Sequence, residues 1–538
     1  MHNLQAELDV VILGGGLAGG TLAVQLLRAD PKLKVLVVDR LPSPLREAAF
    51  KVGESCVEIG AHYLVNVLGL KDHIQSQHLQ KFGFRYFLGD DRSAIESRLE
   101  LGVNIHAPTA TYQIDRGRLE NHLRKEIIQL GGSFLAPAIV KDVEFSSGVM
   151  HLVTIDVDRE TKFFNSRWVV DATGRNGFLK RRLKLQKKVT HNCNASWWRV
   201  KGRFDLSEWC TDPTWKSWEN GIRSRWYSTN HLMGEGYWVW LIPLASGFTS
   251  VGIVADENFH PSHTISTYEK SLSWLREHEP QCAQHLDRQE IADFLFIKDY
   301  AYGCKQVFSG DRWALTGEAG VFLDPFYSPG SDFICISNTF ITDFILRDKA
   351  GQDIEARVML CDQIYLNMFE QFLLAYEDQY QLFGNAAVMP LKIVWDYAIY
   401  WSCVAPLIFE QKLVDLKLLV RLRDVLDQMS DVNQKMQGFF RKWATCDEPL
   451  TNGGRINFFR SEYFFDLNRQ LSIPEPGEFC ERFESKVQLL KALAVEIRDF
   501  ARSRNFEDSI GNTTDWGEPK ALIKGYLSDL GALIAVET

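Results

Sequence analysis

The first residues that could do chemistry are glycines near the amino terminus. Gly14, Gly16 and Gly19 fit the pattern Gly-x-Gly-x-x-Gly, which follows an apolar run and precedes a helical stretch. Without a Cβ the backbone can approach a diphosphate closely, and the N–H groups at a helix start favour its negative charge. Asp39 ends the next apolar run, where a carboxylate can bind ribose hydroxyls. The spacing therefore predicts a dinucleotide site.

The elements around this motif form one predicted βαβ unit. Apolar runs at 10–13 and 34–39 predict strands, with a helix over 21–28 between them. An antiparallel layer is expected between 134 and 170. From residue 338 onward the chain becomes helically periodic and poor in glycine, in the segments 338–346, 353–380 and 413–443. Further strands are predicted over 84–88, 111–114, 149–155, 237–241 and 249–254, and a helix over 118–130.

Composition excludes several classes of function. The net charge of -9 over 538 residues is not that of a generally basic surface, so we expect no nucleic-acid partner. The most apolar stretch, 393–409, is interrupted by Asp396 and Pro406 and predicts a buried helix, not a membrane span. The chain begins without a basic and apolar leader, so a cytoplasmic protein is expected. Ten cysteines without a Cys-x-x-Cys pair predict reduced buried thiols, with neither a metal site nor a disulfide network.

Two later segments resemble the superfamily of FAD-dependent aromatic monooxygenases. Residues 169–175 resemble its Asp-x-x-Thr-Gly segment, and residues 311–319 resemble its Gly-Asp segment. The resemblance implies FAD, with Glu318 in the position of an acid that bonds the ribityl chain and is usually aspartate. Because there is one glycine-rich motif, a dedicated nicotinamide domain is not expected. Electrons would come from NAD(P)H that docks transiently, or from reduced flavin supplied by another protein.

Two further motifs narrow the resemblance to one family. Residues 238–243 match the Trp-x-Trp-x-Ile-Pro motif of flavin-dependent halogenases, and residues 322–330 match their Phe-x-x-Pro-x-x-Ser-x-Gly. Residues 51–55 look like the family's Gly-Glu-Ser loop. Over residues 8–345 the chain is thus identified as similar to the tryptophan and phenol halogenases. The tryptophan pair, Trp238 and Trp240, could equally be a core feature of one strand face.

This resemblance implies an α/β fold. It comprises a Rossmann-type FAD-binding domain (glutathione reductase-like, PHBH-type), an antiparallel β-sheet substrate domain and a C-terminal helical region. The expected boundaries are 1–85, 116–182 and 301–345 for FAD binding, 86–115 and 183–300 for the substrate domain, and 346–538 for the helical region or lid.

The resemblance also implies a reaction and its residues. In the family, reduced FAD and oxygen turn halide into hypohalous acid, which a lysine at a distance from the flavin directs at an electron-rich carbon. Lys81 is the catalytic candidate, and its burial in an apolar strand would lower the pKa of its ammonium group. His62, His73 and His78 are expected at the surface or at helix caps. The expected cofactor contacts are Gly14, Gly16, Leu17, Ala18, Gly19, Asp39, Arg40, Gly53, Glu54, Ser55, Arg118, Asp171, Gly317, Glu318 and Gly330. The substrate and halide contacts expected are Trp238, Trp240, Pro325, Ser328, Pro329, Gly330 and Ser331.

The halide motif departs from the family pattern. Tyr327 stands where tryptophan halogenases have a glutamate, and Pro329 where they have a threonine whose N–H contacts halide. Proline has no N–H, so only Gly330 and Ser331 could donate, and the halide site is either rearranged or lost. The missing glutamate favours a phenolic or similarly activated ring over free tryptophan.

Three functions therefore stay open. The first is a halogenase served by a separate NAD(P)H-dependent flavin reductase, acting on an aromatic small molecule or a carrier-tethered substrate. The second is a monooxygenase on the same scaffold, favoured by Pro329. The third is a flavin-binding protein that recognises partners through its helical region. Aromatic residues in 395–401 and 458–465 suggest that this region forms a wall or lid over the substrate.

Overall fold

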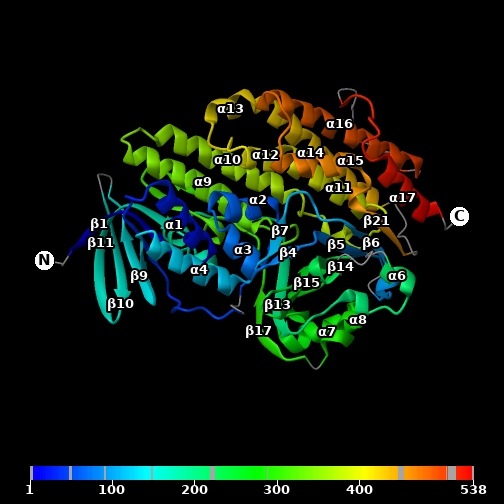
Figure 1. Ribbon diagram of the computed structural model, residues 1–538, viewed down its shortest axis with the longest axis horizontal. Helices are drawn as coiled ribbons and strands as arrows, with labels where there is room; N and C mark the ends of the chain where they lie inside the picture. Colours follow the sequence, from blue (N-terminus) through cyan, green and yellow to red (C-terminus); the bar gives the residue numbers. More distant parts are fainter. Residues whose placement is uncertain are drawn as a thin grey trace. The chain divides into compact units, whose positions relative to one another are not determined.

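The computed structural model describes residues 4–47, 51–89, 92–146, 150–217, 225–287, 289–445, 453–504, 506 and 516–535. The chain forms two compact units, each assembled from three segments, whose elements are labelled in Figure 1. The first unit is Met1–His78, Ile114–Thr190 and Ala301–Phe372. The second is Leu79–Gln113, His191–Tyr300 and Leu373–Thr538. The division into functional segments expected from the sequence stays a prediction.

The first unit is built on a sheet with buried parallel strands. Its order is β19-β20-β11-β1-β2-β8, and all neighbours from β20 to β8 pair in parallel. Residues 10–13 are fully buried, as expected for a parallel strand covered on both faces. The strands are β1 (Leu4–Leu13), β2 (Val35–Val38), β8 (Ser133–Leu135), β11 (Glu160–Asp171), β19 (Phe308–Ser309) and β20 (Trp313–Leu315).

Three long helices of this unit pack together through α1. They are α1 (Leu17–Ala29), α4 (Arg116–Gln129) and α9 (Gly330–Lys349). α1 begins earlier than predicted, because the glycine turn leads directly into it with Gly16 as its N-cap. The expected antiparallel layer is confirmed: β9 (Ala138–Glu144) and β10 (His151–Val157) add antiparallel to β11. Shorter elements are β3 (Ser55–Cys56), α2 (Glu58–His62), a π-helix (Tyr63–Val67), α3 (Lys71–Gln77), α5 (Phe178–Arg182), β12 (Gln186–Lys187) and β18 (Gly303–Cys304), and α10 (Glu355–Leu373) follows α9.

The second unit contains a mixed sheet of order β17-β13-β16-β15-β14-β5-β6-β21. The prediction of an antiparallel sheet holds for most neighbours but is wrong for two pairs, β14 with β5 and β6 with β21, which are parallel. Each of these pairs joins distant chain segments, so no tight turn imposes antiparallel pairing. The strands are β5 (Phe84–Leu88), β6 (Leu99–Gly102), β13 (Cys193–Lys201), β14 (Thr229–Gly234), β15 (Tyr237–Pro243), β16 (Phe248–Asp256), β17 (Ile291–Ile297) and β21 (Gly454–Asn457).

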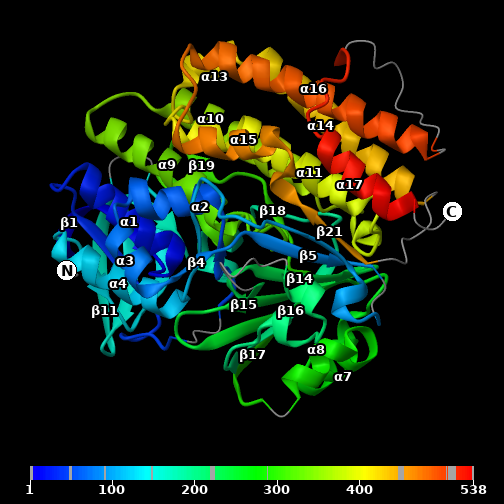
Figure 2. The ribbon, with the colours of Figure 1, turned by 45° about the vertical axis from the view of Figure 1, so that its right-hand side comes forward.

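The two faces of this sheet differ in character. One face packs its alternate residues, such as Phe87, Leu232 and Val239, against α7 (Tyr268–His278) and α8 (Pro280–Leu286) in a continuous apolar core (Figure 2). Because side chains alternate along a strand, the intervening residues occupy the opposite face. Among them are Tyr86 and His231, which are register partners on neighbouring strands. That face therefore carries aromatic and polar side chains such as Tyr86 and His231, together with leucines such as Leu88 and Leu101.

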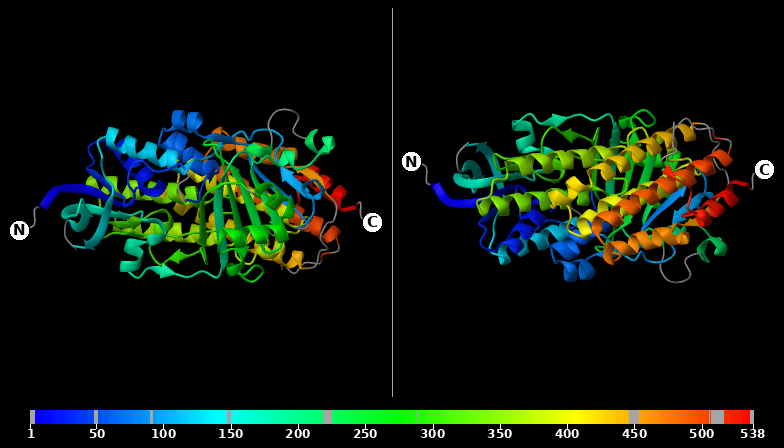
Figure 3. Two further views of the ribbon diagram at one scale, coloured as in Figure 1. Left: turned by 90° about the horizontal axis from the view of Figure 1, so that it is seen from below. Right: turned by 90° about the horizontal axis from the view of Figure 1, so that it is seen from above.

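The carboxyl-terminal third is helical, as predicted. Its long helices α14 (Arg423–Ala444) and α16 (Phe479–Ser503) pack along each other (Figure 3). The helix predicted over 413–443 is interrupted at Leu422, whose ψ of -4° ends the regular geometry between α13 (Leu416–Arg421) and α14. The other helices are α11 (Met389–Ile399), a π-helix (Tyr400–Val404), α12 (Ala405–Phe409), α15 (Glu462–Ser472) and α17 (Lys524–Ala535).

The stretch 393–409 is distributed over α11, the π-helix and α12, and most of its side chains are buried. Within the described residues no helix combines the length and apolarity that a membrane crossing needs. The described cysteines other than Cys480 are buried, as predicted.

Candidate functional site

The glycine turn between β1 and α1 has the geometry of a close-approach loop. Gly14 has a φ of +107°, and a Cβ there would lie 2.3 Å from the carbonyl oxygen of Ala172. A Cβ on Gly19 would lie 1.9 Å from the Gly14 oxygen. Asp39, at the end of β2, accepts a hydrogen bond from the Gly15 N–H at 2.8 Å. The acid found from spacing therefore lies at the turn, as predicted.

Gly16 faces a space bounded by charged groups. A Cβ there would meet Lys51 Nζ at 3.8 Å and the Glu120 carboxylate at 3.9 Å, with nothing nearer. Glu120 is fully buried and forms ion pairs with Lys51 and, at 2.8 Å, with Arg116. Burial raises the pKa of Glu120, but these two cations outweigh burial and lower it. Two cations therefore lie beside the backbone that would receive a diphosphate.

Sequence reasoning missed Lys51, Arg116 and Glu120 and chose Arg118 instead. The Arg118 guanidinium contacts Glu47 at 2.7 Å and the Gln77 carbonyl at 3.3 Å. Arg116 instead donates to the Val52 carbonyl at 2.5 Å, next to Gly53 in the Gly-Glu-Ser loop. The i,i+4 spacing of Arg116 and Glu120 was the available signal.

Among the other predicted cofactor contacts, Arg40 is exposed, and Glu54 and Ser55 are buried. Asp171 is fully buried, and its two oxygens accept from Thr173 and Leu179. Its hydrogen bonds therefore stabilise the turn that follows β11.

Glu318 follows Gly317, whose φ is +58°, in a short 3-10 turn (Gly317–Ala319). Burial raises the pKa of the Glu318 carboxyl, and the cations Arg175, Arg116, Lys180 and Lys51 oppose that shift. A partly buried acid with cations around it can accept hydrogen bonds from hydroxyl groups, which suits a ribityl chain.

The turn before α9 has an unusual backbone. Tyr327 and Ser328 both have positive φ, +67° and +57°, which is sparsely populated for residues with a side chain. Pro329 is the N-cap, and the described residues offer α9 no side-chain cap. A Cβ on Gly330 would meet nothing within 4 Å. The helix start therefore opens onto space at Gly330, where N–H groups favour an anion.

These features fit FAD. α1 also begins with no side-chain cap among the described residues, so its first N–H groups can bind a diphosphate. Asp39 and Glu318 supply acceptors at two positions for hydroxyl groups. Leu17 and Ala18 are the first residues of α1, Gly53 lies in the Gly-Glu-Ser loop, and Gly317 begins the turn that carries Glu318.

Lys81 lies in the second unit, at the end of β4 (Leu79–Lys81), which pairs with β7 (Thr111–Gln113). It is 3% exposed, which is rare for lysine. Its Nζ lies 3.7 Å from the centroid of the Phe84 ring, a cation–π geometry. The residue chosen from its position in the motif is therefore held among aromatic side chains.

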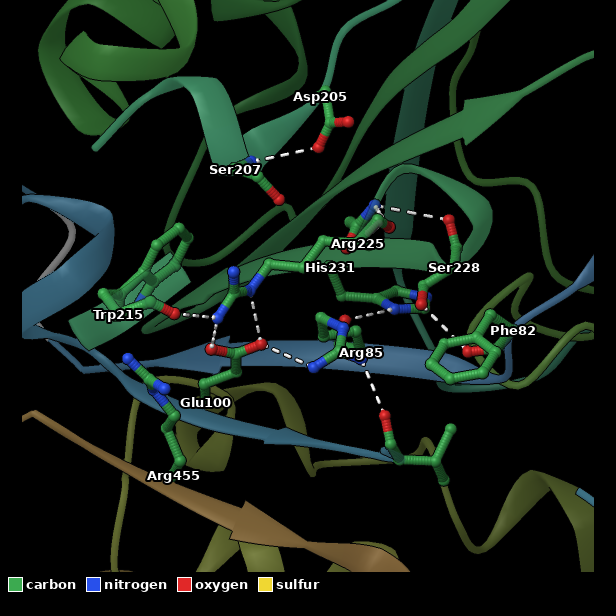
Figure 4. Close-up of polar contacts among 12 residues, drawn as sticks. Phe82, Arg85, Glu100, Asp205, Ser207, Trp215, Arg225, Ser228, His231 and Arg455 are labelled. Carbon is green, nitrogen blue, oxygen red and sulfur yellow. Dashed lines mark hydrogen bonds and ion pairs between the residues drawn. The ribbon is translucent and has the colours of Figure 1, made fainter. Parts of the chain in front are cut away.

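His231, which sequence reasoning missed, also lies beside the Phe84 ring. Its ring stacks on Tyr86 at 4.9 Å and lies 5.3 Å from Trp238. Its Nδ1 donates to the Arg85 carbonyl at 3.3 Å (Figure 4). Burial first, and then the charge of Lys81, lower the pKa of His231 to about 3, so the imidazole is neutral at physiological pH.

Buried ion pairs join β5 and β6 of the mixed sheet (Figure 4). Glu100 is fully buried and accepts from Arg85 at 2.5 Å and from Arg225 at 2.8 Å. The Arg225 guanidinium lies 3.5 Å from the Trp215 ring centroid. These contacts fix β5 and β6 beside each other and thereby the strand that carries Phe84.

Trp238 and Trp240 lie on the same sheet face as His231, with ring centroids 5.6 Å apart. Trp240 covers Gly252 on β16, where a Cβ would lie 2.2 Å from the indole, and donates to the Ser250 hydroxyl at 3.1 Å. Trp238 donates to the Tyr380 hydroxyl at 2.9 Å. Both indoles are thus fixed in position.

The helical region contributes aromatic side chains to this unit, and their expected role as a wall or lid over the substrate stays a prediction. Tyr397 of α11 contacts the Tyr86 hydroxyl at 3.3 Å. Its ring lies 4.9 Å from both Trp401 and Phe458. Side chains far apart in the sequence therefore meet beside the sheet face that carries Tyr86.

Among the histidines near Lys81 in the sequence, His78 is the C-cap residue of α3, which agrees with the expectation of a helix cap. It is buried, and its Nδ1 accepts the N–H of Asp115, the N-cap residue of α4, at 3.1 Å. Burial lowers the pKa of His78 to about 3 and that of His73 to about 4. His62 is half-buried.

Comparison with known proteins gives three kinds of likeness. Residues 9–192 match the lycopene cyclase protein family. The chain is 26% identical over 440 residues to the flavin-dependent halogenase chlA of Dictyostelium discoideum, covering 75% of this chain and 71% of the relative. It is 28% identical over 344 residues to the 1H-pyrrole-2-carbonyl (peptidyl-carrier protein) chlorinase of Pseudomonas fluorescens, covering 60% and 72%. The solved structure of halogenase PltM with phloroglucinol and FAD aligns with a TM-score of 0.66 at 15% identity, over 91% of this chain and 96% of that one.

Proposed function

We propose, from the premise that this chain is a distant member of the flavin-dependent halogenase family, that it halogenates an electron-rich aromatic ring with FAD, oxygen and halide. Bound reduced FAD and oxygen supply the oxidising equivalent that turns chloride or bromide into hypohalous acid. The parallel strand order and the glycine turn support a Rossmann-type FAD domain of the glutathione reductase-like, PHBH type, in the first unit. A separate NAD(P)H-dependent flavin reductase would supply the reduced cofactor.

The observation that carries this proposal is the burial of Lys81 against the Phe84 ring. A buried amine can hold hypohalous acid by hydrogen bonding, or as a haloamine, where few water molecules compete. Carbon attack on the halogen then leaves a proton to be removed from the ring carbon. Trp238 and Trp240 would help keep the substrate away from the oxidising centre, which their fixed indoles suit.

The substrate class follows from a series of neighbouring aromatic side chains that begins at Phe84, the ring against which Lys81 packs. Phe84, Tyr86, Tyr397 and Trp401 offer ring faces, and His231 is uncharged, so a neutral aromatic molecule is favoured. Tyr327 stands in place of the family's glutamate, and this replacement favours a phenol or a similarly activated ring over free tryptophan as the substrate. The name of one relative states a pyrrole bound to a carrier protein, and one similar structure holds free phloroglucinol. Both a free and a carrier-tethered substrate are therefore candidates.

The halide would bind at the start of α9, in the turn that contains Pro325 and Ser328. Pro329 cannot donate, so Gly330 and Ser331 would supply the N–H groups, aided by the partial positive charge of a helix N-terminus. A monooxygenase that uses no halide is the second candidate, and Pro329 is the observation that favours it.

The proposal is tested with Lys81→Ala and a matched exposed lysine, Lys270→Ala. Both variants receive FAD, a flavin reductase, NADH, bromide and a panel of phenols, and brominated product and bound flavin are measured. We expect Lys81→Ala to bind FAD normally and to lose at least about 100-fold in brominated product, a loss typical of removing a reacting group. Lys270→Ala should match the unmodified protein. Retained bromination by Lys81→Ala would remove Lys81 from this role.

A further inference from the structure

Lys180, on the short helix α5, is a buried lysine to which neither the motifs nor the proposed reaction gives a role. It is 5% exposed. Its Nζ donates to the Gly320 carbonyl at 3.1 Å and to the Glu318 carbonyl at 3.4 Å. It also lies 3.8 Å from the centroid of the Tyr302 ring. The ammonium group thus has two carbonyl acceptors and one aromatic face.

These contacts converge on the turn that carries Glu318. Tyr302 donates from its hydroxyl to the same Glu318 carbonyl at 2.7 Å. Its backbone exchanges hydrogen bonds of 3.0 and 2.9 Å with Phe322, the first residue of the Phe-x-x-Pro-x-x-Ser-x-Gly motif. Lys180 and Tyr302 together therefore join α5, the Gly317–Ala319 turn and the beginning of that motif.

We propose that Lys180 is a positioning residue for FAD, and that its ammonium group holds the Gly317–Ala319 turn in the conformation that presents the Glu318 carboxyl to the cofactor. The inference rests on the proposed function only for the identity of the cofactor. It needs neither halide nor substrate, so it can fail or succeed separately from halogenation.

The charge on Lys180 gives this role a pH dependence. Burial lowers the pKa of Lys180 to about 8, opposed by Cys304, Asp171 and Glu318 and assisted by Arg175. The ammonium form, which makes the ion–dipole and cation–π contacts, is therefore lost as pH rises through about 8. Burial raises the pKa of the Cys304 thiol, and the pKa values of Asp171 and Glu318 are likewise raised by burial from their low ordinary values.

The test measures the dissociation constant of FAD from the refolded or flavin-stripped full chain, by flavin fluorescence, between about pH 6.5 and about pH 9. In the unmodified protein the constant should be flat up to about pH 7.5 and then rise several-fold by about pH 9, towards the value of Lys180→Met. Lys180→Met should bind FAD about tenfold more weakly at pH 7 and lose most of the dependence. Lys180→Arg keeps its charge throughout this range, so its curve should be flat to about pH 9.

Lys187→Met is the matched control, because Lys187 belongs to the same unit and is exposed beside Glu370. It should reproduce the curve of the unmodified protein. A flat curve for the unmodified protein would overturn the inference. So would a rise that persists unchanged in Lys180→Met or Lys180→Arg, because the titrating group would then be another one. The comparison with Lys180→Arg decides the matter even if Lys180→Met folds poorly.

Discussion

The indole Nε1 of Trp238 donates a hydrogen bond to the hydroxyl of Tyr380, 2.9 Å away, and both side chains are almost completely buried. Tyr380→Phe should leave this N–H without its acceptor in the core. The expected cost is about 1–3 kcal/mol of unfolding free energy, measured by urea denaturation.

Tyr268→Phe is the control, because Tyr268 is only half-buried at the start of α7. It should change the unfolding free energy by less than about 0.5 kcal/mol. Equal effects of the two substitutions would show that the Trp238 hydrogen bond contributes little.

Substitutions of two glycines in the first turn should have different effects. Gly14→Ala places a Cβ 2.3 Å from the Ala172 oxygen at a φ of +107°, so the folded protein itself should be lost. Gly16→Val adds atoms to the open space near Lys51, so the protein should fold but bind FAD at least about tenfold more weakly through exclusion of the diphosphate.

Circular dichroism and the flavin content of purified protein distinguish these outcomes. Gly438→Ala in α14 is the control and should affect neither, because a Cβ there would meet only the Arg441 guanidinium, at 3.8 Å. Full flavin occupancy in Gly16→Val would contradict the assignment of the diphosphate site.

The sequence predicted those parts of the molecule that depend on local pattern. Strands such as β5 and β15 and the helix α4 were found because alternation and helical spacing are local properties. The glycine turn and Asp39 were found because their separation is fixed by one βαβ unit. Lys81 was chosen from its place after a motif; its expected burial is confirmed, and its catalytic role stays a prediction.

The parts that were missed depend on convergence of distant segments. Lys51 and Glu120 meet beside Gly16 only after folding, and no local pattern predicts that contact. His231 becomes a neighbour of Tyr86 because β14 and β5 pair in parallel, and no turn sequence predicts this pairing. Tyr327 and Ser328 have positive φ although neither residue type favours it.

Asp348 provides a prediction for acid stability. Burial raises its pKa, but hydrogen bonds from Arg167, Arg312 and Trp168 outweigh burial and lower the pKa to about 2. A carboxyl whose pKa is depressed on folding stabilises the protein above its ordinary pKa, and this contribution is lost as pH falls. The ionised Asp348 should therefore contribute to the free energy of unfolding above about pH 4, and this contribution should be lost between about pH 4 and about pH 2. Asp348→Asn lacks this contribution at every pH.

The measurement is the thermal unfolding midpoint of the two proteins as a function of pH. The difference between them should be constant from about pH 5 to about pH 7 and should shrink below about pH 4. A difference that does not change with pH would mean that the Asp348 charge is not what stabilises this cluster.

Because Pro329 has no N–H, crystallography can test whether Gly330 and Ser331 bind the halide instead. In crystals with FAD and bromide, anomalous density is expected beside the N–H groups of Gly330 and Ser331 at the start of α9. Crystals with nitrate in place of bromide are the control and should show none. Bromide that binds only elsewhere would leave the α9 start without this function.

The central claim, halogen transfer to an aromatic ring, is tested most directly by the mass of the product. The unmodified protein, with FAD, a flavin reductase, NADH and oxygen, is given phenolic substrates in parallel with bromide and without added halide. The account predicts a product in which one hydrogen is replaced by bromine, formed only when bromide is present. A product that gains one oxygen atom, at the same rate with and without bromide, would contradict it.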